Sequence, residues 1–196
     1  HIIRSSVRLV SATMHIRHLF LAIISISFFW AMGAILASQF PPLVKNVLGA
    51  DEGVATLMLA VFSVGVALGS VAINRMLSGK VSARFSPASA LVMGLFILDL
   101  YWTVLHWPPA THGGELLSLS EFLTIGKADR LTFDLFGVAV AGGMFVVPLY
   151  AFLTTTVPKD QTARTVAANN IVNSGAMVVA ALLLAVLLYF GVSVAD

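Results

Sequence analysis

The chain has 196 residues, of which 59% are hydrophobic and 10% charged, with a formal net charge of +2 and a mean hydropathy of +0.97. A water-soluble fold of this length cannot bury so much apolar surface, so the composition predicts an all-α integral membrane protein. The sequence contains no cysteine, which excludes disulfides and thiolate metal sites.

Residues 1–18 precede the first apolar stretch. Ile3, Val7 and Val10 recur there at helical spacing beside Arg4 and Arg8, which predicts a cytoplasmic amphipathic linker. No short apolar core with a small-residue cleavage site occurs, so a signal peptide is not expected.

Residues 19–196 predict a transmembrane half-domain. It contains five apolar stretches, and each can supply the roughly 20 residues that a helix needs to cross a hydrocarbon core. We place the spans at about 19–40, 53–74, 86–107, 133–156 and 165–190. The chain begins with His1 and stops as the fifth span emerges, so we expect a piece of a longer protein with a final helix still to follow.

The connections contain helix-ending and helix-starting signals. Pro41 and Pro42 are expected to end the first span, because proline removes a backbone donor. In the long third connection, Ser118 and Glu121 have capping-box spacing. They predict either a short interfacial helix or an ordered loop with a few apolar anchors.

The basic residues fall on alternate connections, which predicts an orientation. With a cytoplasmic N-terminus, eight of them are inside and three outside, a positive-inside bias. The inner set is Arg4, Arg8, Arg17, Arg75, Lys80, Arg84, Lys159 and Arg164, and the outer set is Lys45, Lys127 and Arg130. The sequence pI of ≈ 9.2 follows from this topology and does not indicate nucleic-acid binding.

Small residues recur four apart within the spans, which is typical of close helix packing. The pairs are Gly65 with Gly69, Ala139 with Gly143, and Ala176 with Ala180.

Polar residues inside the spans are the candidate binding residues. Asp99 is costly to place in lipid, so it is expected to face a protein interior, a water-filled cavity or the headgroups. Asn169, Asn170 and Asn173 begin the fifth span, and their amides could bind a lipid headgroup or join neighbouring helices. Gln39 lies at the end of the first span, where solvation is the simpler explanation.

Catalytic patterns are not found in the sequence. It has no His-x-x-x-His or Glu-x-x-His metal motif, no G-x-S-x-G elbow and no glycine-rich phosphate loop. We therefore expect no enzymatic activity, no cofactor and no metal within this chain.

The second connection resembles the loop between the eighth and ninth helices of major facilitator transporters. The similarity lies in Gly69, Asn74, Arg75, Gly79 and Lys80, within GS at 69–70, NR at 74–75 and SGK at 78–80. Asn74 departs from the commoner signature, which has an acid there. The resemblance implies a cytoplasmic gating loop that couples the two halves of a carrier.

Longer stretches are similar to the lysophospholipid transporters of that superfamily. They are FWAMGA at 29–34, QFP at 39–41, VLGADE at 47–52, LAVFSVG at 59–65, FVVPLYAF at 145–152 and AANNIVN at 167–173. The resemblance implies five of the six helices of a C-terminal major facilitator half-bundle in a bacterial inner membrane. The N-terminal half and the final helix of the parent chain would then be its partners.

The family resemblance also implies a function. Such carriers flip lysophospholipids, such as lysophosphatidylethanolamine, inward by alternating access, and some are fused to an acyltransferase and an acyl-carrier-protein ligase. The residues quoted leave two alternatives open. One is another major facilitator carrier for drug or metabolite efflux, and the other is a non-transporting membrane domain of a fused acyltransferase.

Overall fold

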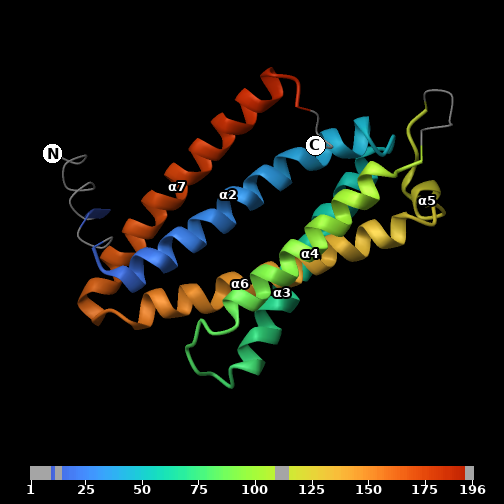
Figure 1. Cartoon of the computed structure of the whole chain (residues 1–196). Helices are drawn as coiled ribbons and strands as arrows, with labels where there is room; N and C mark the ends of the chain where they lie inside the picture. Colours follow the sequence, from blue (N-terminus) through green and yellow to red (C-terminus); the bar gives the residue numbers. More distant parts are fainter. Residues whose placement is uncertain (1–9, 12–14, 109–114, 193–196) are drawn as a thin grey trace.

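The computed structural model describes residues 10–11, 15–108 and 115–192, and these parts of the chain form an all-α fold (Figure 1). Most of the predicted linker at 1–18 lies outside the described residues. Five helices are long and apolar enough to cross a membrane, as the sequence predicts. They are α2 (Arg17–Asn46), α3 (Glu52–Met76), α4 (Ser86–Leu105), α6 (Ala128–Thr155) and α7 (Lys159–Tyr189).

The prediction that Pro41 and Pro42 end the first span is wrong, because α2 continues through both to Asn46. The prolines leave the carbonyls of the preceding turn without their usual donors. However, Phe40 and Val44 on either side are buried in one apolar cluster. Packing of this last stretch therefore outweighs the missing hydrogen bonds.

Helix α6 is the centre of the bundle and packs against α2, α3, α4 and α7. In Figure 1, α7 runs beside α2, while α3 and α4 lie along α6. Helix α6 begins at Ala128, about one turn before the predicted span. Helix α7 begins at Lys159, also earlier than predicted, and much of its apolar surface is exposed.

Two of the predicted small-residue pairs meet each other where α3 crosses α6. A Cβ atom added to Gly65 would lie 2.6 Å from the Cβ of Ala139, and one added to Gly69 would overlap the Val140 carbonyl. A Cβ on Gly143 would likewise overlap the Val66 carbonyl. The two backbones are therefore in direct contact, as expected for small residues at a membrane helix crossing.

The third predicted pair, on α7, is less buried than the other two. Ala176 and Ala180 are only partly buried, and a Cβ on the adjacent Gly175 would meet nothing within 4 Å.

Of the two alternatives predicted for the long connection, the structure shows the short helix, α5 (Leu119–Phe122). Ser118 and Glu121 form a complete capping box at its start. Apolar anchors are present as well, since Phe122 is fully buried and stacks on Trp107. Leu117 pairs with Ala50 in an isolated parallel bridge, so this segment is tied to the bundle.

Candidate functional site

A hydrogen-bonded group of four side chains joins α2, α6 and α7, and we call it the amide network. Ser27 Oγ donates to Asn173 Oδ1 at 2.6 Å, and Asn173 Nδ2 donates to Tyr150 Oη at 3.3 Å. Trp30 Nε1 donates to the same hydroxyl at 2.9 Å. Ser27 and Asn173 are both buried, which makes these bonds a specific link between helices that are otherwise apolar.

Asn169 lies one turn before Asn173 on α7 and is fully buried. Neither its Oδ1 nor its Nδ2 has a hydrogen-bond partner. A buried amide without partners costs free energy, so it calls for an explanation such as a ligand that it binds in another state. It is the most unusual of the predicted polar residues.

Asn170 points elsewhere. Its side chain is exposed, unlike those of Asn169 and Asn173. Asn169 and Asn173 are four positions apart and share one face of α7, whereas Asn170 lies on another face. The three amides therefore form no single cluster.

Gln39 borders a cavity of about 350 Å³ between α2, α4 and α7. The Gln39 side chain donates to Ser38 Oγ at 3.2 Å, and Tyr101 is the other polar side chain at the wall. The remaining lining is apolar and consists of Ile35, Leu36, Phe40, Leu43, Ile97, Leu100, Val104, Leu184, Leu187, Leu188 and Val192. A cavity of this composition suits a hydrocarbon chain.

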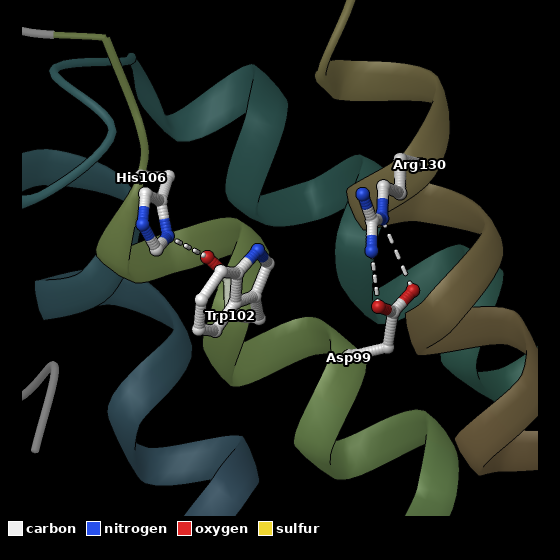
Figure 2. A network of polar contacts seen from close by, with 4 residues as sticks. All are labelled: Asp99, Trp102, His106 and Arg130. Atoms are coloured by element: carbon white, nitrogen blue, oxygen red, sulfur yellow. Dashed lines mark hydrogen bonds and ion pairs between the residues drawn. The ribbon is translucent and has the colours of Figure 1, made fainter.

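Asp99 is paired with Arg130 across the contact between α4 and α6, as Figure 2 shows. Arg130 Nε donates to Asp99 Oδ2 at 3.1 Å, and Nη2 donates to Oδ1, which makes the pair bidentate. The side chains are 53% and 40% exposed for Arg130 and Asp99. In the same view His106 Nδ1 lies 2.9 Å from the Trp102 carbonyl. Asp99 is on α4, a helix that contributes no side chain to the amide network.

The predicted gating residues divide into two places. Gly69 is buried in the crossing of α3 and α6, whereas Asn74 and Arg75 are exposed in the last turn of α3. Gly79 has a φ of +73, a backbone conformation that favours glycine, and Lys80 N donates to the Leu77 carbonyl at 2.9 Å. The connection is thus a tight turn with an exposed basic surface.

Sequence reasoning missed Asp134, which is 1% exposed on α6. Its signal was a carboxylate inside the predicted span 133–156, one helical turn after Arg130. It also missed Ser27, Trp30 and Tyr150, whose partners are too distant in sequence to identify.

Among the described residues, no group of three or more His, Asp or Glu side chains could hold a metal ion. Comparison with known proteins finds no matching family model, no matching curated protein and no matching solved structure.

Proposed function

We propose that this chain is part of a secondary transporter that flips lysophospholipids inward across a bacterial inner membrane by alternating access. It would form five helices of the C-terminal half of a major facilitator carrier, with its N-terminus cytoplasmic. The resemblance of the quoted sequence stretches and the lysine and arginine distribution support this proposal.

The apolar cavity beside Gln39 is the observation that carries the proposal. Its volume of about 350 Å³ is at the lower end of the roughly 300–1,000 Å³ typical of ligand pockets. Two polar side chains, Gln39 and Tyr101, within otherwise apolar walls match an amphipathic molecule with a single acyl chain. A polar metabolite without a chain would leave most of these walls without an apolar partner.

Asn169 supports a headgroup role for α7. Its buried amide has a free donor and a free acceptor, which are the groups needed to bind a phosphate or an ethanolamine. Opening of the bundle during alternating access would bring Asn169, in the cytoplasmic third of α7, into contact with substrate.

Transport of labelled lysophosphatidylethanolamine by the full-length protein in liposomes tests the proposal. Leu187→Trp fills the cavity and should lower transport several-fold, because Leu187 lines it. Leu183→Trp is the matched control, since Leu183 is exposed on the same helix and does not line the cavity.

The alternatives give different results. Transport of a compound without an acyl chain, but not of lysolipid, would favour another major facilitator carrier. No transport of either by a folded protein would favour a non-transporting domain of a fused acyltransferase.

A further inference from the structure

Two polar side chains on α4 face two on α6, and together they form what we call the carboxylate cluster. Asp99 and Thr103 are one turn apart on α4, and Arg130 and Asp134 are one turn apart on α6. Asp134 lies close enough to Asp99, Arg130 and Thr103 for their charges and dipoles to act on its carboxyl group, so the four side chains form one group. The Asp99–Arg130 pair at its outer edge is visible in Figure 2.

The inner edge of this cluster is buried and lacks partners. Asp134 is 1% exposed and its Oδ2 accepts no hydrogen bond. Thr103 is 2% exposed and its Oγ1 also has no partner. Two free oxygen atoms therefore lie on facing helices where water does not reach them.

The charges in the cluster do not balance. It holds two carboxylates, Asp99 and Asp134, but one guanidinium, and Arg130 is engaged in a bidentate pair with Asp99. A buried carboxylate without its own cation is strongly disfavoured in an apolar environment, and a neighbouring carboxylate disfavours it further.

Other ionisable groups do not compensate Asp134. On the helices packed against α6, the other ionisable side chains lie at or near helix ends, apart from the exposed Tyr101. They are Arg17, His18 and Lys45 on α2, Glu52 and Arg75 on α3, His106 at the end of α4, and Lys159, Asp160, Arg164 and Tyr189 on α7, while α6 itself adds Asp129 and Tyr150 and is preceded by Lys127.

We propose that Asp134 is a proton-binding site whose occupancy is controlled by the partner of Arg130. While Arg130 is paired with Asp99, Asp134 carries the proton and is neutral. When Arg130 turns to Asp134, one turn away on its own helix, the O–H bond of the carboxylic acid breaks and the proton passes to water at the exposed edge of the cluster, where Asp99 is 40% exposed. The guanidinium then balances the carboxylate that remains.

A proton fits this site better than a metal cation. Only two fully buried oxygens there lack partners, Asp134 Oδ2 and Thr103 Oγ1, fewer than a hard cation requires. The positive charge of Arg130 also repels a second cation beside it. The inference does not depend on which substrate the protein carries.

Infrared spectroscopy of the full-length protein in lipid bilayers tests this site without a transport assay. At mildly acidic pH we expect the C=O stretching band of a protonated carboxylic acid, and Asp134→Asn should remove it. Asp129→Asn is the matched control, because Asp129 is exposed on the same helix and its loss should leave the band unchanged.

A second variant tests whether Arg130 determines the protonation of Asp134. It also keeps the test valid if Asp134→Asn misfolds. Asp99→Asn frees Arg130 to pair with Asp134, so the band should disappear although Asp134 is still present. A band that persists in either Asp134→Asn or Asp99→Asn, or that is missing from the wild type, would overturn the proposal. Loss of the band on adding Na⁺ would also overturn it, since the ligand would then be a metal cation.

Discussion

Ser27 and Asn173 are 146 positions apart in the chain, and Ser27 Oγ donates a hydrogen bond to Asn173 Oδ1 at 2.6 Å. This bond and its continuation to Tyr150 are the polar link between α2, α6 and α7. Interhelical hydrogen bonds in membranes contribute about 0.6 kcal/mol on average. The network therefore fixes which faces of the helices meet more than it stabilises the fold.

Ser27→Ala should lower the free energy of unfolding by about 0.5–1 kcal/mol, because it leaves the Asn173 carbonyl oxygen without its donor. Ser25→Ala is the control, since Ser25 lies on the same helix outside the network. Denaturant unfolding in detergent measures both variants. Equal effects would show that the bond to Asn173 does not matter.

Asn169→Leu should raise the free energy of unfolding by about 1 kcal/mol, because it removes two buried polar atoms that have no partners. If Asn169 binds the headgroup, the same variant should lower lysolipid transport several-fold. Thermal unfolding and transport are measured side by side, with the exposed Asn170→Leu as control for stability. A destabilised Asn169→Leu protein would show that the amide has a structural role.

Gly69→Ala should destabilise the bundle by about 2 kcal/mol, because its Cβ would overlap the Val140 carbonyl, and a backbone atom cannot move aside locally. Gly94→Ala provides the control, since nothing lies within 4 Å of its added Cβ, and alanine favours the helix. Unfolding of both variants in detergent gives the comparison. Similar stabilities would mean that α3 and α6 are not in close contact at Gly69.

Cysteine labelling tests the proposed orientation, and the cysteine-free sequence makes single-cysteine variants unambiguous. A membrane-impermeant reagent added outside intact cells should modify Ser120→Cys and spare Ser78→Cys. Ser120 is chosen because it is exposed and leaves the capping box formed by Ser118 intact. The opposite labelling pattern would invert the topology.

Arg75→Ala should slow transport several-fold with normal membrane insertion, if the connection after α3 gates the cytoplasmic side. Arg75 is exposed, so its loss removes little packing. Arg84→Ala tests specificity, because it removes the same charge from the same connection. Equal transport by both variants and the wild type would reduce the basic residues to a topology signal.

The helix count and type could be predicted from the sequence because they depend on local composition. Apolar length defines each span, and Ser118 with Glu121 defines the start of α5, since both signals lie within a few residues. The effect of Pro41 and Pro42 could not be predicted. It depends on the burial of Phe40 and Val44, which involves residues from other helices.

The candidate site was predictable only in part, because its geometry depends on which helix faces meet. The sequence indicates that Asn169 and Asn173 share a face, but it gives no sign that one amide is bonded and the other is not. Asp99 was identified by its depth in a span. Its partner Arg130 and the neighbouring Asp134 became apparent only when α4 and α6 were seen to pack together.

The pairing of α2 with α7 joins the first and the last of the five long helices, and this affects how the protein is made. A chain emerges from the ribosome N-terminus first, so α2 enters the bilayer well before α7 is synthesised. Tyr150 on α6 can give Trp30 a partner once α6 is inserted, but Ser27 must wait for Asn173 on α7. An assembly intermediate in which α6 is inserted and α7 is not therefore leaves the Ser27 hydroxyl without its acceptor, and the arrival of α7 supplies it.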